Sequence, residues 1–217
     1  MMTYCIDYIP RLDSKDPAGT IHLLHLLTPQ PIGCNNWPER FPYSPQVNFR
    51  IAHNGPDLFL LFQVSESCTQ ACISEDNGEV WTDSCVELFI SVDDNGYYNF
   101  EFTCIGKMLL GFRKERPGGI LASPNILQTI KRYSSLGNTC FEERKGDQNW
   151  HLLVSIPATA LFRHQLQDWQ NVQARANLYK CGDRLSQPHY LSWSPIHTEK
   201  PDFHVPQYFT KVLFNSR

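Results

Sequence analysis

The strongest constraint on this chain is a β-hairpin predicted between residues 86 and 103. Two segments with apolar side chains at every second position are joined by Asp93-Asp94-Asn95-Gly96. A period of two is typical of strands, and Asn-Gly supplies the positive φ angles that a tight hairpin turn needs. We therefore expect two neighbouring antiparallel strands. The positions that we predict to face the core, here and in a similar alternation at 172–178, are Val86, Leu88, Ile90, Tyr98, Phe100, Phe102, Val172, Ala174 and Leu178.

The opposite face of this hairpin carries Glu87, Asn99 and Glu101, and Trp81 lies just before it. Polar residues on the outer face of an antiparallel sheet are usually only solvated. A carboxylate-rich face beside a tryptophan is also how proteins hold sugars, because the ring stacks on the C–H face of a pyranose while carboxylates and amides bind its hydroxyls. The local pattern alone leaves both interpretations open.

Strand-like segments recur along the chain, with turn signals between them. We predict further strands at 47–52, 58–64, 106–112, 150–156, 172–179 and 209–214. Residues 65–78 are polar and rich in turn formers, which indicates a loop, and 158–166 is the one short helix that we expect. At least seven strands and one helix predict an all-β protein, an antiparallel β-sandwich of two sheets with an immunoglobulin-like or jelly-roll-like architecture.

The chain length of 217 residues fits a single domain, which we expect to span residues 1–217. Its first part, residues 1–45, contains many prolines and is therefore expected to be irregular. Trp37 in this part is interpreted as an aromatic plug over the end of the core.

Composition excludes several classes of partner. The formal charge is -3 and no run of Lys or Arg occurs, so we expect neither nucleic acid nor an anionic membrane as a partner. The apolar segment 22–27 is too short to span a bilayer. The N-terminus lacks the features of a secretion signal, so we expect a cytoplasmic protein, or a periplasmic or extracellular one if a signal has been removed. We expect a monomer.

Metal and disulfide signals are weak in this sequence. The eight cysteines lack framework spacing, and we expect all of them to be reduced. Cys68 and Cys72 are four residues apart without a second pair, which is a poor zinc signal. His189, His197 and His204 are irregularly spaced, which favours solvated or capping histidines over a metal site. We predict neither a metal site nor a cofactor from these residues.

Several motifs together resemble the family 9 carbohydrate-binding modules and their relatives in the DOMON-like superfamily. The motifs, in order, are Val-Trp-x-Asp-Ser-Cys-Val-Glu-Leu-Phe-Ile at 80–90, Gly-Tyr-Tyr-Asn-Phe-Glu-Phe at 96–102, Arg-x-Asn-x-Tyr at 175–179, Ser-Trp-Ser-Pro at 192–195 and Pro-Asp-Phe-His-x-Pro at 201–206. The resemblance spans roughly residues 45–215 and implies the sandwich fold.

The resemblance also implies a non-catalytic protein that binds a mono- or oligosaccharide. In sugar-binding relatives the sugar is clamped between two tryptophans, which Trp81 and Trp193 match by position, over a carboxylate that Glu87 matches. Arg175 and Asn177 are compatible with the polar floor. Structural calcium also occurs in the family, and the oxygens of residues 93–96 could supply ligands, although the hairpin turn explains them equally well.

Two other functions stay open at the level of sequence. A haem-binding or electron-transfer relative would need axial His or Met ligands, and the chain has three methionines and no Cys-x-x-Cys-His motif. A glycoside-acting enzyme would use Glu87 and Glu101 as its carboxylate pair, although nothing in the sequence marks one of them as an acid with a raised pKa. We favour the non-catalytic carbohydrate-binding protein.

Overall fold

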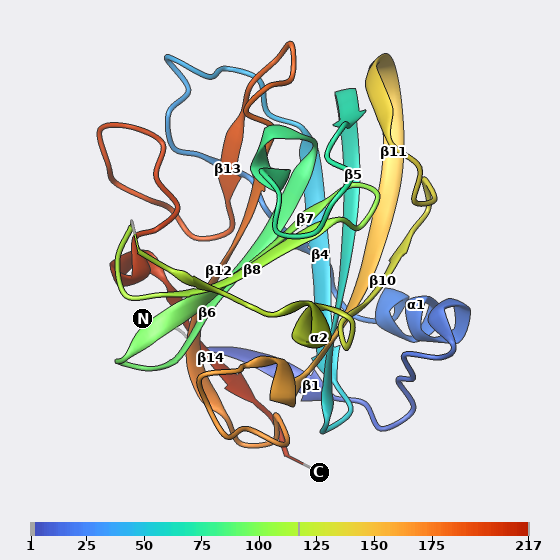
Figure 1. Ribbon diagram of the computed structural model, residues 1–217, viewed down its shortest axis with the longest axis vertical. Coiled ribbons are helices and arrows are strands. Elements are labelled where there is room, and N and C mark those ends of the chain that lie inside the picture. The colour runs from blue at the N-terminus through green and yellow to red at the C-terminus, as the bar shows by residue number, and fades with distance from the viewer. Residues whose placement is uncertain (1–2, 117, 217) are drawn as a thin grey trace.

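The computed structural model describes residues 3–116 and 118–216 and consists mainly of β-strands (Figure 1). The strands are β1 Tyr4–Tyr8, β2 Gln30–Pro31, β3 Cys34–Asn35, β4 Gln46–His53, β5 Asp57–Ala71, β6 Cys85–Asp93, β7 Gly96–Thr103, β8 Met108–Arg113, β9 Ile120–Leu121, β10 Lys131–Ser134, β11 Phe141–Pro157, β12 Gln173–Cys181, β13 Tyr190–Ser192 and β14 Thr210–Phe214. The helices are α1 Pro17–His25 and α2 Pro124–Leu127, with 3₁₀ turns η1 Val80–Thr82, η2 Ala158–Ala160 and η3 Pro206–Tyr208. In the described part of the chain, no helix has the length and apolar character needed to cross a membrane.

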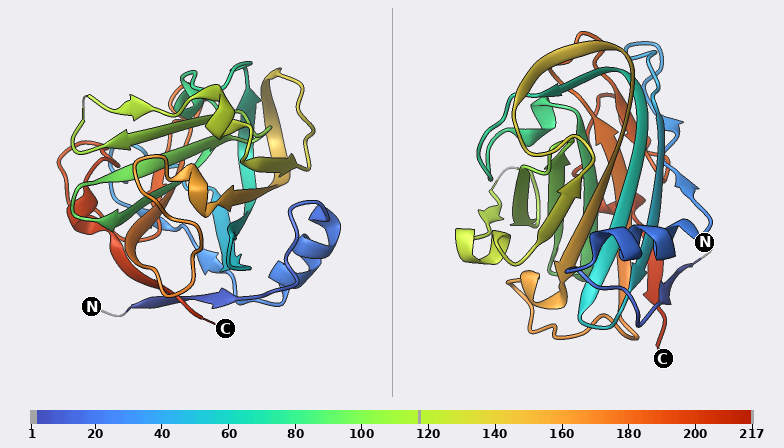
Figure 2. Two further views of the ribbon diagram at one scale, coloured as in Figure 1. Left: turned by 60° about the horizontal axis from the view of Figure 1, so that its bottom comes forward. Right: turned by 90° about the vertical axis from the view of Figure 1, so that its right-hand side faces the viewer.

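The strands form one curled sheet in the order β10-β11-β5-β4-β1-β14-β12-β6-β7-β8-β9. Its two halves face each other as layers across the core (Figure 2). Strand β1 joins the halves, since Tyr4–Ile6 pair with β14 and Asp7–Tyr8 pair with β4, both in parallel. The prediction of a fold built mainly from strands, with few helices, is confirmed, whereas the strands form one curled sheet where two separate sheets were expected. The prediction of purely antiparallel sheets is wrong, because β1 bridges the layers with parallel pairings.

The central hairpin forms at the predicted place, although only Gly96 of the Asn95-Gly96 pair has a positive φ. Strands β6 and β7 are antiparallel, with Asp93 opposite Gly96 across the turn. Gly96 has φ 151°, and a Cβ there would lie 2.4 Å from the carbonyl oxygen of Arg113. A side chain at this position would therefore collide with β8.

The core lies between the two layers and contains the residues that the alternation predicts. Eight of the nine predicted positions are buried in one hydrophobic cluster, and the ninth, Val172, is partly buried and packs against it. The period of two in β6, β7 and β12 therefore sets which face of each strand turns inward.

The helix content differs from the prediction in two parts of the chain, residues 158–166 and the proline-rich first part. Residues 158–166 form only the 3₁₀ turn η2, because Leu161 leaves helical geometry with ψ 68°. Helix α1 instead lies in the proline-rich first part: Asp16 caps it by accepting the Gly19 N–H at 3.0 Å, and Pro17 occupies the first turn. Proline at this position is compatible with a helix, since no intrahelical partner is lost there. Leu24 anchors α1 on the outer face of β4, β5 and β11.

The predicted loop at 65–78 is shorter than expected. Strand β5 continues to Ala71 because β11 is long enough to pair with it, although the pairing shifts register between Phe141 and Gln148. The chain then turns through η1 to reach β6, which places Trp81 beside the sheet.

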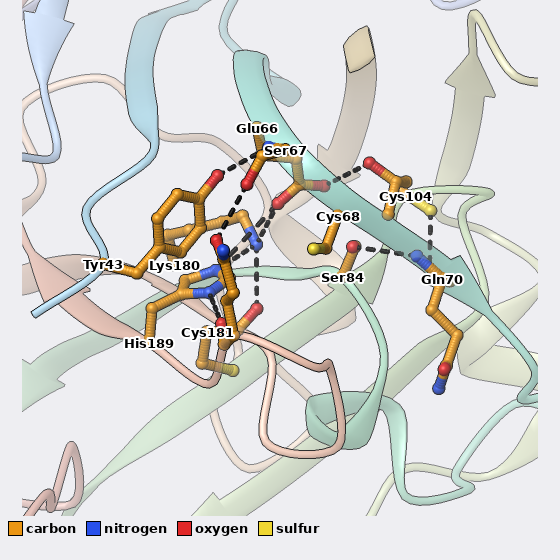
Figure 3. A network of polar contacts seen from close by, with 12 residues as sticks. Tyr43, Glu66, Ser67, Cys68, Gln70, Ser84, Cys104, Lys180, Cys181 and His189 are labelled. Carbon is orange, nitrogen blue, oxygen red and sulfur yellow. Dashed lines mark hydrogen bonds and ion pairs between the residues drawn. The ribbon is translucent and has the colours of Figure 1, made fainter. Parts of the chain in front are cut away.

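One buried polar network joins the two layers (Figure 3). Lys180 of β12 lies 2.9 Å from Glu66 of β5 and 2.8 Å from His189 Nε2. The other carboxylate oxygen of Glu66 accepts hydrogen bonds from Trp150 Nε1 at 2.7 Å and the Thr69 hydroxyl at 2.9 Å. Burial and the neighbouring Lys180 lower the pKa of His189 well below its ordinary value, so the ring is neutral near pH 7.

Candidate functional site

The face of β12, β6, β7 and β8 that points away from the main core is covered by protein. Loop segments around Trp37 and Phe203 fold over it, and the Trp37 indole donates to the Thr198 carbonyl at 2.8 Å. A second hydrophobic cluster fills much of this space and includes Phe89, Tyr97 and Tyr179. A pocket of about 390 Å³ remains, lined by Arg40, Phe41, Trp81, Glu87, Phe89, Glu101, Arg113, Arg116, Cys181, Asp183, Tyr190, Lys200, Pro201, Asp202, Phe203 and His204.

Two carboxyl groups lie at the floor of this pocket. Glu87 on β6 and Glu101 on β7 are direct cross-strand partners, and their exposed fractions are 2% and 4%. The local pattern left solvation open for them, but the covering loops keep both out of bulk solvent. Asn99 donates to Glu101 Oε1 at 2.8 Å, whereas Glu101 Oε2 has no hydrogen-bond partner among the described residues.

Burial controls the protonation of this carboxyl pair. Loss of solvation, followed by the nearby charge of Glu101, raises the pKa of Glu87 well above its ordinary value. Burial raises the pKa of Glu101 to about 7, opposed by the hydrogen bond from Asn99 and by Arg113. Glu87 therefore keeps its proton to higher pH than a solvated carboxyl group does, and in that protonated form it can both donate and accept a hydrogen bond.

Two thiols lie beside the same carboxyl group. Cys85 and Cys181 face each other across β6 and β12. The Cys181 thiol donates to Glu87 Oε1 at 3.1 Å, and Cys85 Sγ lies 3.9 Å from the same oxygen. Burial raises the pKa of Cys85 to about 12, so this thiol is neutral at physiological pH.

Trp81 forms part of the pocket wall. It belongs to η1 and is partly buried against the second hydrophobic cluster. Its carbonyl accepts the backbone N–H of Asp183 at 3.2 Å, which brings the Asp183 carboxylate to the same pocket. Phe41 and Tyr190 pack edge to face at 4.7 Å on the pocket lining. The wall therefore offers aromatic surface next to charged groups.

Basic side chains complete the lining. Arg113 donates from Nε to Asn99 Oδ1 at 3.2 Å and so supports the residue that holds Glu101. Arg116 forms an exposed ion pair with Asp202 at 3.7 Å. Burial, Arg116 and Arg113 lower the pKa of His204 to about 3, so this ring is neutral near pH 7. The pocket thus contains fixed donors and acceptors of both charges.

The structure brings together part of the predicted site. Trp81, Glu87 and Glu101 line one pocket. Asn99 lies behind Glu101 and positions it through the hydrogen bond described above. The sequence alternation placed these three polar residues on one face, and the η1 turn adds the tryptophan.

Trp193 is not part of this pocket. Its ring packs edge to face against Tyr4 at 5.2 Å and Phe49 at 5.4 Å, on the main core between the layers. The reason is strand parity: Ser192 is opposite Tyr179 and shares its face, so Leu191 and Trp193 point to the other face. The predicted clamp of Trp81 and Trp193 is therefore not formed in this structure.

Arg175 and Asn177 also lie outside the pocket. Arg175 pairs with Asp94 at 2.7 Å beside the hairpin turn. Asn177 is buried, donates to the Ser194 carbonyl at 3.1 Å and accepts from the Leu178 and Ser194 backbone N–H groups. It therefore anchors the irregular segment that follows β13. Neither residue lines the pocket over Glu87, and a role of either one in binding a ligand stays a prediction.

The acidic turn at 93–96 is occupied by side-chain partners. Asp93 accepts from the Asn95 backbone and amide, and its carboxylate lies 3.0 Å from His164 Nε2. Asp94 pairs with Arg175. These contacts favour the interpretation as a hairpin turn, and calcium binding here stays a prediction.

The sequence pattern missed Asp183, Arg113 and Tyr190, which reach the pocket from separate parts of the chain. The only available signal was the crowding of aromatic residues between Tyr190 and Phe203. Non-local folding of these loops decides the rest, because their side chains meet only after the loops cross the sheet.

The weak metal signals do not meet in space. Cys68 is buried and Cys72 is exposed. His189 contacts Lys180, His204 contacts the Tyr97 hydroxyl and His197 packs on Tyr208, so the three histidines have separate surroundings. All eight cysteines are free thiols.

The sequence profile of carbohydrate-binding family 9 matches residues 22–214. The chain belongs to this family. Family 9 consists of non-catalytic carbohydrate-binding modules, which confirms the expectation that this protein is not an enzyme. None of the curated proteins matches the chain.

Solved structures agree with the assignment to family 9. A candidate carbohydrate-binding protein from Bacteroides uniformis ATCC 8492 is 38% identical and superposes with a TM-score of 0.93, covering 98% of this chain and 99% of that one. A family 9 module from Caldicellulosiruptor kristjanssonii in complex with glucose has 8% identity and a TM-score of 0.58 over 100% of this chain and 97% of its own. The same type of module in complex with cellotriose gives 8% and 0.59, over 100% and 95%. These two show the shared fold.

Proposed function

We propose that this family 9 protein binds a mono- or oligosaccharide in the pocket over Glu87 and Glu101, with Trp81 as its stacking surface. The observation that carries the proposal is the combination of an aromatic wall with two buried carboxyl groups in one pocket of about 390 Å³. That volume is in the range of small-ligand sites.

The chemistry of a sugar requires both kinds of surface. Its apolar area is limited to the C–H faces of the ring, so affinity depends on a flat aromatic partner, and selectivity depends on fixed groups at the hydroxyl rim. Trp81 supplies the flat surface, and Glu87, Glu101 and Asp183 supply polar groups at the same pocket.

The protonation state of the floor suits a neutral ligand. Burial favours the protonated form of Glu87, and in that form the carboxyl group can donate to a sugar oxygen as well as accept from a hydroxyl. Glu101 Oε2 has no hydrogen-bond partner among the residues described, so it can accept a hydrogen bond from a sugar hydroxyl when Glu101 is ionised, or donate one when Glu101 is protonated. A hydroxyl there would satisfy a buried acceptor that otherwise costs stability.

Calorimetric titration with glucose and cellotriose, the ligands of the two family 9 relatives, is the first test, followed by a glycan array if neither binds. Trp81→Ala should weaken binding by about 5- to 150-fold, since a stacking anchor contributes about 1–3 kcal/mol. Trp193→Phe is the matched control, because it changes a tryptophan outside the pocket, and it should leave the affinity within about twofold. Unchanged affinity in Trp81→Ala would show that this pocket is not the binding site.

A further inference from the structure

The floor of the pocket brings two thiols and one carboxyl group together from two adjacent strands. Cys85 Sγ, Cys181 Sγ and one carboxylate oxygen of Glu87 all lie within 4.8 Å of one another, and all three residues are buried. Sulfur and carboxylate oxygen are both ligands that Zn²⁺ accepts in proteins. In the described part of the chain, this is the one group of His, Cys, Asp or Glu side chains close enough to hold a metal ion.

The spacing of these atoms fits tetrahedral coordination. With metal–sulfur and metal–oxygen bonds of about 2.3 and 2.1 Å, ligand atoms at tetrahedral angles lie roughly 3.6 Å apart. The two sulfur-to-oxygen distances in the structure, 3.1 Å for Cys181 and 3.9 Å for Cys85, lie on either side of that value. Small side-chain rotations would therefore bring the two sulfur atoms and the oxygen to bonding distance from one ion.

A second observation at the same place indicates a missing partner. Glu101, directly opposite Glu87, is 4% exposed, lines the same pocket and has no hydrogen-bond partner for Oε2 among the described residues. Buried carboxylate oxygens are normally satisfied, so an unpartnered one indicates an absent ligand, water or ion. A water on the metal, held toward the pocket, would donate to this oxygen.

We propose that Cys85, Cys181 and Glu87 form a binding site for a thiophilic divalent cation such as Zn²⁺, with a water molecule in the fourth position next to Glu101. Three protein ligands with an open fourth position are typical of zinc sites in which water or another small molecule occupies the fourth position. This site does not depend on sugar binding, because all its ligands are present in the free protein.

The charge balance explains why the site is neutral without metal. Burial raises the pKa of Cys85 to about 12 and the pKa of Glu87 well above its ordinary value, while the hydrogen bond with Cys85, followed by burial, raises the pKa of Cys181. A divalent cation supplies positive charge, and each coordinating group then gives up its proton to solvent. Binding therefore releases up to three protons, two from the thiols and one from Glu87, and becomes tighter as pH rises.

Spectroscopic titration with Co²⁺, followed by displacement with Zn²⁺, tests the site in the absence of sugar. The protein should be a Cys5→Ser, Cys72→Ser, Cys140→Ser variant, because those three thiols are exposed and would bind metal themselves. A phosphine reductant keeps the remaining thiols reduced. We expect one equivalent of Co²⁺ to give sulfur-to-metal charge-transfer absorption and the visible bands of tetrahedral Co²⁺.

Further substitutions in this background assign the ligands. Cys85→Ala and Cys181→Ala should each reduce the charge-transfer absorption by about half or more and weaken binding at least tenfold. Glu87→Gln should keep both thiolate contributions while weakening binding about tenfold. Cys68→Ser, at a buried thiol that contacts Ser186 outside the site, is the matched control and should change nothing. Near-ultraviolet circular dichroism shows whether each variant is folded.

Two results would overturn the proposal: no stoichiometric Co²⁺ binding by the folded parent, or an unchanged spectrum in a folded Cys85→Ala/Cys181→Ala double variant. Sugar affinity is measured separately with a chelator present. Absence of Co²⁺ binding would therefore not affect the measured sugar affinity, and absence of sugar binding would not affect the Co²⁺ titration.

Discussion

Two buried clusters of carboxyl groups lie on opposite sides of strand β12, and they differ in the partners that surround them. Lys180 and Cys181 are consecutive residues whose side chains point to opposite faces of the sheet. On the core side, Glu66 lies 2.9 Å from Lys180 (Figure 3). Trp150 also donates a hydrogen bond to Glu66. On the pocket side, Glu87 meets only neutral thiols and a second carboxyl group, Glu101.

The difference separates a structural cluster from one that is ready for a ligand. The three glutamates are almost equally buried, at 4% exposure for Glu66, 2% for Glu87 and 4% for Glu101. Glu66 is compensated inside the protein, which fixes the distance between the layers. Among the described residues no Lys or Arg forms an ion pair with Glu87 or Glu101, although Arg113 and Arg116 line the same pocket. Burial therefore favours the protonated carboxyl groups, or a partner from outside the chain. The same substitution, Glu to Gln, should therefore have different consequences at the three positions.

Glu66→Gln should have the largest effect. Loss of the carboxylate leaves Lys180 as an uncompensated buried charge, which typically costs about 3–5 kcal/mol. Urea denaturation should show this fall in the free energy of unfolding. The double variant Glu66→Gln/Lys180→Met should be more stable than Glu66→Gln alone, because it removes the stranded charge. A loss below about 1 kcal/mol in the single variant would contradict the structural role of the pair.

Glu101→Gln should change how stability depends on pH. The pKa of Glu101 in the folded protein is about 7, above its ordinary value of 4.5, so the native state holds a proton that the unfolded chain releases between these two values. The free energy of unfolding of the natural protein should therefore fall, relative to the variant, by about 3 kcal/mol as pH rises from 4 to 8. Urea titrations of both proteins at several pH values measure the difference. If the free energy of unfolding of the natural protein, relative to that of the variant, stays constant or increases as pH rises, Glu101 is not held protonated by burial.

Glu87→Gln should affect binding more than stability. Glutamine is close in shape to the protonated carboxyl group, so we expect the free energy of unfolding at pH 7 to change by less than about 1 kcal/mol. Sugar affinity should fall about fivefold, the equivalent of one altered hydrogen bond of about 1 kcal/mol. Calorimetry and urea denaturation on the same preparation separate the two effects. A large loss of stability with unchanged sugar affinity would place Glu87 with Glu66 as a structural residue.

Arg175→Ala should have the smallest effect. Its partner Asp94 is almost fully exposed, and exposed ion pairs contribute between about 0 and 1 kcal/mol. We expect a loss of stability of at most about 0.5 kcal/mol and no change in sugar affinity. Weaker sugar binding in this variant would indicate that the ligand contacts the surface around Arg175 and Asp94, outside the pocket over Glu87.

The central hairpin and the face of each strand were predictable because they depend on local rules. Alternation in β6, β7 and β12 gave the core side correctly, and Asn95-Gly96 gave the turn. The same rule applied to β13 would have placed Trp193 on the face of Leu191, in the main core. The family resemblance matched Trp193 to the second clamp tryptophan by its position in the sequence. That match did not consider which face of the sheet Trp193 occupies, and the structure places it on the face opposite to the pocket.

The burial of Glu87 and Glu101 could not be predicted from their strands. Alternation gave their face but not what covers it, because the cover comes from loops more than 40 residues before and more than 90 residues after them. Helix α1 was missed for a different reason: prolines were interpreted as breaks, although Asp16 followed by Pro17 is a start signal for a helix.

The most direct test of the binding pocket uses the five tryptophans as separate reporters. Protein labelled with 5-fluorotryptophan should give one ¹⁹F resonance for each of them, and single Trp→Phe variants assign these signals. Titration with a sugar that binds should shift the Trp81 resonance most. The resonances of Trp169, in the main core, and of Trp193, which packs against that core, should stay in place. A large shift of Trp193 with an unmoved Trp81 would contradict the account.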